Sequence, residues 1–447
     1  MSAFMHVATR SHFWVAALFL LVALGIGQSP ARGQQDLVSF AGQTMGTTYS
    51  IKIAPPHDSL PDDLRFQVDA ELRTVNDQMS TYLKSSEISQ FNASDSTDWF
   101  DVSDATALVV KRALEISELT DGGFDVTVGP LVDAWSFGPA PRSNQIPDDA
   151  TLERLKAATG YSHLHVRLQP PALRKDIPDL RIDLSAIAKG HGVDRIVELL
   201  QSTGAQNVFV EIGGEIRTTG AKPTGPWMVG IQAPDQAMNR PAIAHGLTNG
   251  AIATSGDYRN FFMIDGVRYS HTIDPRTGRP VKHDVASVSV ITDDCMSADA
   301  WATAINVLGP DAGIEAAKAE GLDVLVIHRN QDGYDAAATG QFQAYVDQLT
   351  TVKGSDESNA KDESSLVSRV LPLAVVTAVF MGIVVTGMAV GVMFGRRAIS
   401  GSCGGLNSKT NPDGSTSCSL CSNPSDACKE LREKMQADKS AAENVAS

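Results

Sequence analysis

Cysteine is scarce in this chain of 447 residues, and its placement is uneven. Cys295 is the only cysteine before residue 400, so the long N-terminal part has no pair of thiols from which to build a disulfide framework. Positive charge is also in short supply, because 37 Lys and Arg stand against 52 Asp and Glu, a net charge of −15. Binding to nucleic acid needs a cationic surface, so this balance argues against nucleic acid as a partner.

Long uncharged runs occur at two places, one near each end of the chain. Near the N-terminus, an apolar stretch at 13–26 follows Arg10, and the small residues Ala31 and Gly33 form a possible cleavage site. This pattern predicts an export signal over 1–33, either cleaved or kept as a signal anchor. No cysteine follows the run, which excludes a lipoprotein anchor.

The second uncharged run, at 371–394, is long enough to cross a hydrocarbon layer of about 30 Å as a helix. A polar, acidic linker at 351–368 precedes it, and Arg396 and Arg397 follow it directly. The linker has too few apolar residues to form a core. Because basic residues flank the cytoplasmic end of a span, we expect one transmembrane helix at 369–395 with its C-terminal side in the cytoplasm.

The tail beyond this span, 396–447, holds the remaining thiols: Cys403, Cys418, Cys421 and Cys428. Thiolates bind soft or borderline metals, so iron, an iron–sulfur cluster and a structural zinc are all open from the spacing alone. A disulfide is not expected on the reducing side of a membrane. Cys295, by contrast, has no neighbours that suggest a nucleophile, and we expect a buried core thiol.

Between signal and linker, residues 36–350 have the pattern of one α+β domain. Apolar residues at helical spacing predict helices at 62–82, 104–119 (with Asp104 as N-cap), 186–201 and 298–308. Short apolar runs predict strands, several of them antiparallel, and Gly213-Gly214 predicts a hairpin. The expected strands are 48–53, 208–212, 215–219, 228–231, 267–270, 287–292 and 324–328.

Six polar motifs lie in this domain where folding alone does not demand them. They are TMGTT at 44–48, MSTY at 79–82, DGGFDVTVGPL at 121–131, IDLSAIAKG at 182–190, SHTIDPRTG at 270–278 and SADAWATA at 297–304. Each motif alone fits an ordinary turn or helix cap; for instance, the Asp-Leu-Ser at 183–185 is typical of an N-cap. Their number favours a shared functional site.

The residue types in these motifs suit phosphoryl transfer from a nucleotide. Aspartate and threonine oxygens are the hard ligands that Mg²⁺ prefers, and Mg²⁺ usually acts together with substrate phosphates. A helix that begins at Ala186 would offer free amides to a phosphate, and Lys189 would neutralise its charge. His271 is a natural proton carrier near neutral pH. Asp299 and Thr303 are four residues apart, so a helix places both on one face, which supports a shared ion.

In this order, the six motifs resemble the ApbE family, the FAD:protein FMN transferases, over residues 38–345. The resemblance implies an α+β transferase domain with a mixed sheet and a Mg²⁺-dependent reaction. In that reaction a threonine hydroxyl of an acceptor protein attacks the FMN-side phosphorus of FAD, AMP leaves, and FMN stays attached through a phosphoester. The implied acceptors are subunits of the sodium-pumping NADH:quinone reductase and of related Rnf complexes.

The resemblance also implies roles for single residues within the motifs. His271 and Asp274 are the candidates for activating the acceptor hydroxyl. The implied Mg²⁺ ligands are the backbone carbonyl of Ala186 and the side chains of Asp299 and Thr303. Some members carry Glu where this chain has Lys189, so the exact role of that residue stays open. The implied FAD contacts are Met45, Tyr82, Gly123, Phe124, Asp125, Asp183, Lys189 and Ile273.

The C-terminal part, about 370–430, resembles NqrM through the Ser-Cys-Gly-Gly-Leu segment at 402–406 beside a span and the three later cysteines. This resemblance implies delivery of iron to the same sodium-pumping reductase. We therefore expect a two-function maturation factor in the bacterial inner membrane, with a periplasmic transferase domain and a cytoplasmic tail. Two alternatives stay open: an FAD pyrophosphatase that releases FMN and AMP, and a non-catalytic membrane adaptor that handles flavin or iron.

Overall fold

The chain divides into two compact units, 1–357 and 358–447. The computed structural model describes residues 37–56, 60–138, 145–232, 241–256, 261–264, 266–331, 333–346, 409–410 and 416–417. The described part of the second unit is a short antiparallel pair, β18 (Lys409–Thr410) with β19 (Thr416–Ser417).

The predicted signal, linker, membrane span and tail cysteines all lie outside the described residues. Among the residues that are described, no helix is both long enough and apolar enough to cross a membrane. One span at 369–395 and a metal site at the tail cysteines therefore stay predictions.

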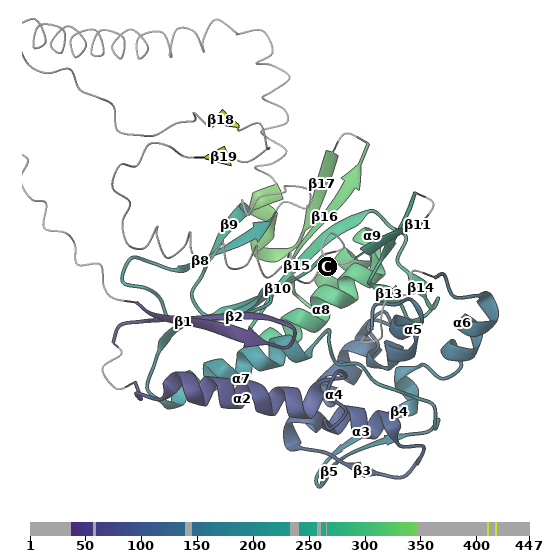
Figure 1. The fold of residues 1–447 in the computed structure, drawn as a ribbon. Coiled ribbons are helices and arrows are strands. Elements are labelled where there is room, and N and C mark those ends of the chain that lie inside the picture. The colour runs from purple at the N-terminus through teal and green to yellow at the C-terminus, as the bar shows by residue number, and fades with distance from the viewer. Residues whose placement is uncertain are drawn as a thin grey trace, which may run out of the picture. The chain divides into compact units, whose positions relative to one another are not determined.

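An eight-stranded sheet forms the centre of the first unit (Figure 1). Each neighbouring pair in it is antiparallel, so the expectation of a mixed sheet was wrong. Helical segments connect β2 to β6 and β15 to β16, and in each case the chain returns in the opposite direction beside the strand that it left. A parallel pair would need a crossover connection to the other end of the sheet. In spatial order the strands are β1 (Val38–Thr44), β2 (Thr47–Ala54), β6 (Asn207–Ile212), β7 (Glu215–Thr219), β10 (Gly250–Gly256), β15 (Val285–Thr292), β16 (Asp323–Asn330) and β17 (Gly333–Ala338).

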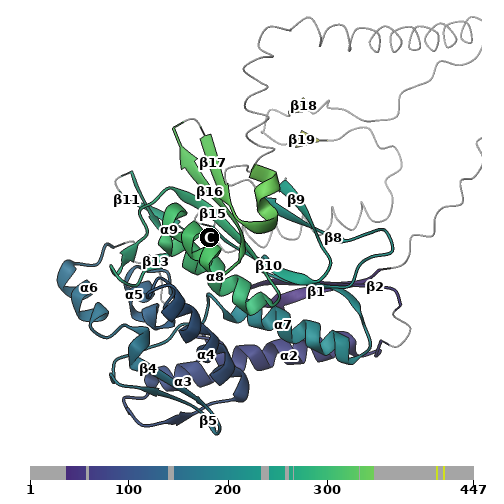
Figure 2. The same ribbon diagram turned by 180° about the vertical axis from the view of Figure 1, so that it is seen from behind.

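The helices enter the chain mainly at two points, between β2 and β6 and between β15 and β16. The first group is α2 (Leu64–Met79), α3 (Glu87–Ala93), α4 (Asp104–Leu119), α5 (Gly129–Ala134), α6 (Asp149–Lys156) and α7 (Ala188–Ser202). The second is α8 (Cys295–Leu308) and α9 (Pro310–Ala319). Helix α7 packs on β6 and β7, and α8 packs on β10 and β15. Figure 2 shows α8 and α9 lying together over the sheet.

Smaller strand pairs and single turns of 3-10 helix complete the unit. The pairs are β3 (Phe100–Asp101) and β4 (Leu164–Leu168) on β5 (Pro171–Lys175), β8 (Trp227–Gln232) with β9 (Pro241–Leu247), β11 (Phe261–Ile264) with β12 (Val267–Ser270), and β13 (Ile273–Asp274) with β14 (Arg279–Pro280). The 3-10 turns are Val126–Val128, Tyr161–His163 and Gly340–Phe342.

Both faces of the sheet are buried at β16, because alternate residues of this strand belong to different cores. Val324 and Val326 of β16 face the main core, which the helices complete. Leu325 and Ile327, the residues between and after them, belong to a second core with β8 and β9. Its neighbour β15 is buried along almost its whole length and supports α8, which carries two predicted site residues.

The predicted helices are present: α4 has its predicted limits, and α2, α7 and α8 have shifted ends. The segment 104–119 is α4, but its N-cap is Ser103, whose hydroxyl accepts a hydrogen bond within the first turn, and not Asp104. Helix α7 begins at Ala188, two residues after the predicted start, and α8 begins at Cys295, three residues before it. Cys295 is fully buried, which confirms the prediction of a core thiol.

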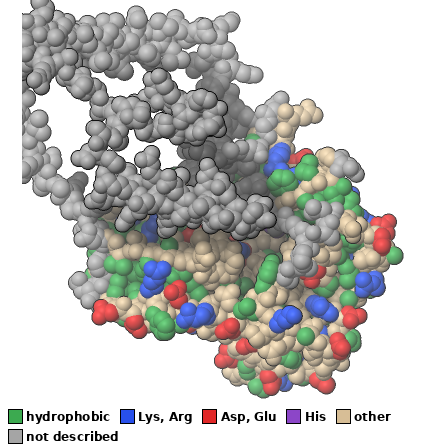
Figure 3. All heavy atoms as spheres, viewed as in Figure 1, with side chains coloured by type: hydrophobic (Ala, Val, Ile, Leu, Met, Phe, Trp, Pro, Cys, Tyr) green, Lys and Arg blue, Asp and Glu red, His purple; other side chains and the backbone are tan. Residues whose placement is uncertain are grey.

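Figure 3 shows charged side chains of both signs on one face of the described domain. On the face shown in Figure 3, acidic and basic side chains alternate around the lower edge and do not gather in one patch.

Candidate active site

A cavity of about 910 Å³ opens beside the C-terminal end of α2, the N-terminal end of α7 and one face of α8. Its wall contains residues from all six polar motifs, although the first motif begins at residue 44 and the last ends at residue 304. The fold therefore brings together segments that the sequence keeps far apart. This convergence is the first structural support for one shared site.

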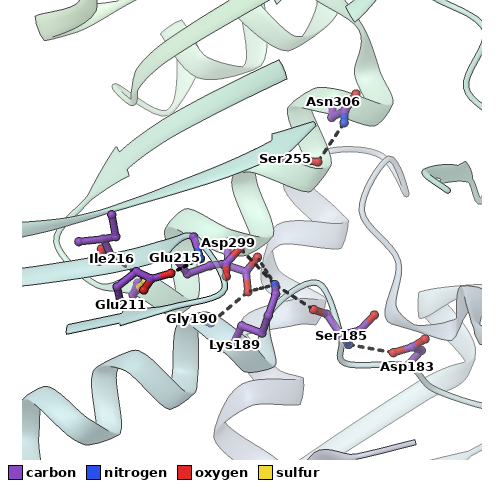
Figure 4. A network of polar contacts seen from close by, with 12 residues as sticks. Asp183, Ser185, Lys189, Gly190, Glu211, Glu215, Ile216, Ser255, Asp299 and Asn306 are labelled. Atoms are coloured by element: carbon purple, nitrogen blue, oxygen red, sulfur yellow. Dashed lines mark hydrogen bonds and ion pairs between the residues drawn. The ribbon is translucent and has the colours of Figure 1, made fainter. Parts of the chain in front are cut away.

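Lys189, in the first turn of α7, lies between two buried carboxylates (Figure 4). Its Nζ is 3.2 Å from Oε1 of Glu215 and 3.4 Å from Oδ1 of Asp299. Both carboxylates are 5% exposed. Burial on its own would lower the pKa of Lys189, but the two carboxylates outweigh it and raise that pKa above its usual value. The side chain is therefore a fixed cation at neutral pH.

Glu215 is a site residue that the sequence reasoning missed. Burial raises the pKa of Glu215 to about 7, against the opposing effect of Lys189. Its Oε2 is buried and makes no hydrogen bond within the described residues. One signal was present in the sequence: an acidic residue directly after Gly213-Gly214, at the start of a strand.

The turn before Glu215 needs glycine at position 213. Gly213 has φ = 65°, in the left-handed region that favours glycine. A Cβ on Gly213 would lie 2.9 Å from Cγ2 of Thr47 and 3.3 Å from Oε2 of Glu215. Glycine therefore lets this turn pack closely against Thr47 and the Glu215 carboxylate.

Asp299 and Thr303 of α8 both line the cavity, as their spacing predicts, and Ala186 lines it from the loop before α7. Oδ2 of Asp299 accepts a hydrogen bond of 3.0 Å from the backbone N–H of Gly190. No group of three or more His, Cys, Asp or Glu in the described ranges is placed to hold a metal. A cation here would therefore need carbonyl and hydroxyl oxygens as well as carboxylates, a donor set that Mg²⁺ accepts. The unpartnered oxygen of Glu215 fits such an ion.

Met45 reaches the cavity from the turn between β1 and β2. Met45 and Gly46 have φ values of 50° and 73°, which is the pattern of a type I′ hairpin turn. Asn76 of α2 donates a hydrogen bond of 3.1 Å to the hydroxyl of Thr44, directly before the turn. Helix α2 thereby fixes the position of the Met45 turn on the cavity wall.

Asp183 and Tyr82 lie on another part of the wall. Oδ1 of Asp183 accepts a hydrogen bond of 2.8 Å from Ser185 N, so this aspartate shapes a turn and does not cap α7, which begins five residues later. Tyr82 is 68% exposed, and its ring is available to a ligand. Partial burial, with Asp183 and Asp133 nearby, raises the pKa of Tyr82, so its hydroxyl stays protonated at neutral pH.

Gly123, Phe124 and Asp125 also line the cavity, but the carboxylate of Asp125 has a structural task. Its Oδ1 accepts hydrogen bonds from the N–H and hydroxyl of Thr127, at 2.8 and 2.7 Å. Its Oδ2 accepts one of 2.8 Å from Tyr161 N. Burial raises the pKa of Asp125. The side chain therefore holds the loop in shape, while its predicted contact with FAD stays a prediction.

Of the two residues predicted to activate an acceptor hydroxyl, the structure places only one on the cavity wall. His271, directly after β12, lines the cavity and meets the ring of Phe137 edge-on at 6.3 Å. Asp274 is not among the lining residues, although Ile273 beside it is. The Asp274 carboxylate accepts hydrogen bonds from Nε and Nη2 of Arg276, at 2.9 and 3.0 Å. The geometry favours His271 for chemistry and gives Asp274 a part in the loop.

Comparison with known proteins agrees with this site. The family model described as "ApbE family" matches residues 45–326. This chain belongs to the ApbE family. That match includes every residue of the cavity wall and all six motifs except Thr44, so the residues of the site are residues of the ApbE domain.

Two curated ApbE relatives carry the name FAD:protein FMN transferase. The protein from Vibrio cholerae is 46% identical over 337 residues, which are 74% of this chain and 98% of the relative. The protein from Escherichia coli is 36% identical over 344 residues, 76% of this chain and 97% of the relative.

Solved structures of ApbE proteins share the fold. The flavin transferase ApbE from Vibrio cholerae has a TM-score of 0.64 at 46% identity, covering 69% of this chain and 99% of that one. The apo form of the flavinyl transferase ApbE from Pseudomonas stutzeri has a TM-score of 0.64 at 35% identity, covering 69% and 96%. In each case the ApbE domain accounts for nearly the whole relative but leaves about a quarter to a third of this chain unmatched.

Proposed function

We propose that this chain is an FAD:protein FMN transferase that requires Mg²⁺. Family membership and the shared name of the curated relatives support the enzyme class. The observation that carries the proposal is the buried cluster of Lys189, Glu215 and Asp299 on the wall of a large cavity. Such a cluster offers a fixed cation and hard oxygen ligands at one place, which is what a pyrophosphate and its metal ion need.

The size of the cavity suits a dinucleotide. At about 910 Å³ it lies near the upper end of ligand pockets, which run from about 300 to about 1,000 Å³. We propose that Met45, Tyr82 and Ile273 contact the flat or apolar parts of FAD, and that Asp183 accepts hydrogen bonds from its polar edge. The Lys189 end of the cavity then receives the negatively charged pyrophosphate.

The reaction forms one bond and breaks another at the FMN-side phosphorus. The oxygen of an acceptor threonine attacks this phosphorus, the bond from phosphorus to the bridging oxygen breaks, and AMP leaves with that oxygen. The hydroxyl proton is transferred to a base. Mg²⁺, held by the Ala186 carbonyl, Asp299 and Thr303, would stabilise the negative charge that builds on the phosphate oxygens.

His271 is the proposed base. It is the one histidine on the cavity wall among the described residues, and a neutral imidazole can accept a proton near pH 7. Lys189 stays protonated because of its two carboxylates and serves as a fixed positive charge. Asp274 acts indirectly, through the loop that it forms with Arg276 directly after His271.

The test uses the full-length chain with FAD, Mg²⁺ and a flavin-acceptor subunit of a sodium-pumping NADH:quinone reductase or Rnf complex. AMP is measured by chromatography with and without the acceptor. We expect AMP release that requires both the acceptor and Mg²⁺ and stops with EDTA. Equal AMP release without the acceptor would instead identify an FAD pyrophosphatase, and no AMP under any condition would identify a flavin-binding adaptor.

We also propose, from the sequence alone, that the C-terminal part is an NqrM-like unit that supports iron-site maturation of the same reductase. A signal at 1–33 and a span at 369–395 would place the transferase domain in the periplasm and the tail in the cytoplasm. Iron analysis of the full-length chain and of a Cys418→Ser, Cys421→Ser variant tests the metal. Labelling of the tail thiols in intact cells with a membrane-impermeant reagent would contradict the cytoplasmic placement.

A further inference from the structure

A second ion pair lies close to the Lys189 cluster and joins the same three elements. Asp194 of α7 is five residues after Lys189, and Arg217 of β7 is two residues after Glu215. Nη1 of Arg217 donates to Oδ1 of Asp194 at 2.7 Å. Asp194 is 6% exposed, so its carboxylate is largely removed from water, whereas Arg217 is partly exposed.

The carboxylate of Asp194 also binds the start of α8. Its Oδ1 accepts a hydrogen bond of 2.9 Å from Cys295 N, and its Oδ2 accepts one of 2.9 Å from Met296 N. These are the first two residues of α8, whose amides have no partner within the helix. A negative charge at a helix N-terminus is also favoured by the helix dipole. One side chain of α7 thus satisfies the buried N-terminus of α8.

A second contact fixes the same two helices nearby. Gly190 of α7 approaches α8 so closely that a Cβ there would lie 2.2 Å from the carbonyl oxygen of Cys295. The N–H of Gly190 donates to Asp299, one helical turn after Cys295. Because the contacts at Gly190 and Asp194 are one turn apart on α7, they fix how α8 lies along α7. They also fix where α8 presents Asp299 and Thr303.

We infer that Asp194 and Arg217 are positioning residues for the part of the cavity wall where we propose that Asp299 and Thr303 bind Mg²⁺. They tie α7, α8 and β7 together, and these elements carry Lys189, Asp299 and Glu215 respectively. The pair touches neither the cavity nor the proposed ligands, so it acts through the elements that it joins. This inference rests on the proposed function, because it assumes that Mg²⁺ binds at Asp299.

A purely structural role makes a different prediction from a positioning role. A buried ion pair is weak support for stability, because desolvation of the charges offsets their attraction. If Asp194 only stabilised the fold, its replacement would lower the melting temperature but leave the folded protein with unchanged Mg²⁺ affinity. If it positions Asp299, the folded variant binds Mg²⁺ more weakly.

The experiment measures Mg²⁺ binding to the full-length chain by calorimetry, well below the melting temperature of each variant. Asp194→Asn keeps the size of the side chain but loses the charge and one acceptor. We expect a dissociation constant for Mg²⁺ at least about 10-fold higher, the range found when groups that orient metal ligands are replaced. Arg217→Gln, which frees β7 but leaves Asp194 bound to α8, is expected to give a smaller increase.

The matched control is Arg195→Gln, at the next position of the same helix. Nε of Arg195 pairs with Glu71 of α2 at 2.8 Å, so this variant loses an ion pair of α7 that does not involve α8 or β7. We expect a lower melting temperature and unchanged Mg²⁺ affinity.

Two results would overturn the inference. One is wild-type Mg²⁺ affinity in folded Asp194→Asn. The other, decisive if Asp194→Asn does not fold, is wild-type affinity in Arg217→Gln. Failure of the proposed function looks different, because then the wild-type chain itself binds no Mg²⁺ and transfers no FMN.

Discussion

At the scale of single residues, the site is defined by charges that are buried but paired. Lys189 forms ion pairs with both Glu215 and Asp299, and Oε2 of Glu215 makes no hydrogen bond within the described residues. Buried charges are costly unless they are compensated. A substitution that removes one of the three therefore changes how the other two are bound, as well as what they bind.

Asp299→Asn should abolish most of the transfer with little effect on the fold. The amide keeps an oxygen for Gly190 N but removes the charge that faces Lys189 and that we propose binds Mg²⁺. We expect FMN transfer to fall by about 100-fold or more, the scale of a lost electrostatic contact in a transition state. Initial rates and a thermal melt measure the two effects separately.

The control for that variant is Asp148→Asn, the same chemical change at a helix cap remote from the cavity. Oδ1 of Asp148 accepts a hydrogen bond of 2.7 Å from Thr151 N, and asparagine caps about as well. Transfer should stay at the wild-type rate. Equal losses of activity in the two variants would remove the case for a special role of Asp299.

His191 predicts a pH dependence of stability. It is 5% exposed on α7, and burial, aided by Arg195, lowers its pKa from 6.5 to about 4. The unfolded chain therefore binds more protons than the folded chain between these values, so stability falls as the pH drops from about 6.5 to about 4. A shift of this size is worth about 3 kcal/mol. Urea unfolding of wild type and His191→Gln across this range should show a shallower pH slope for the variant; parallel slopes would refute the assignment.

At the scale of elements, the contact between α7 and α8 determines where Asp299 and Thr303 lie relative to Lys189. Substitution of two glycines on α7, Gly190 and Gly192, tests the importance of this contact. A Cβ on Gly190 would lie 2.2 Å from the backbone oxygen of Cys295, whereas a Cβ on Gly192 would meet Cδ1 of Ile212 at an ordinary 3.4 Å. Helix propensity favours alanine at both positions. The two substitutions therefore differ only in whether the helices must move apart.

Gly190→Ala should destabilise the protein by about 1–3 kcal/mol through overpacking and should also weaken Mg²⁺ binding. Gly192→Ala should leave both near wild type or slightly improve stability. Urea unfolding and calorimetry on the same samples check this. If Gly190→Ala were as stable and as active as Gly192→Ala, the close approach of the two helices would not be required for stability or for activity.

The sequence predicted elements with strong local patterns and missed those without them. Helix α4 has its predicted limits because apolar residues such as Val109 and Val110 recur at helical spacing and Ser103 caps it. Strand β10, GAIATSG, was missed because small residues give it little strand signal; its place is set by pairing with β7 and β15. The antiparallel order of the sheet depends on such long-range pairings.

The same distinction holds within the site. Motifs identified most of the cavity wall, because short segments with unusual polar residues are visible in the sequence. Glu215 and Asp194 were missed because each acts through a partner on another element, Lys189 or the start of α8. Asp274 stood inside a motif, yet its carboxylate faces Arg276, and the sequence does not show the direction of a side chain.

At the scale of the whole molecule, the transferase fits within the first unit. The family match ends at residue 326, and the first unit ends at residue 357. The curated relatives are covered almost completely by about three quarters of this chain. The remaining residues therefore lie outside the part of the chain that matches these relatives.

A chain that ends at residue 357 should therefore keep the transfer reaction. We expect its kcat with FAD and an acceptor in solution to lie within about two-fold of the full-length value, because no cavity residue is removed. Rates compared at equal concentrations of folded protein measure this. Loss of activity in a truncated chain that melts like the full-length protein would show that the second unit takes part in the chemistry.

The most direct test of the account is the intact mass of the acceptor after reaction with the full-length chain, FAD and Mg²⁺. The account predicts a gain of one FMN, located by fragmentation on a threonine, absent with EDTA and absent with Asp299→Asn. An acceptor of unchanged mass, with FAD bound and Mg²⁺ present, would contradict it.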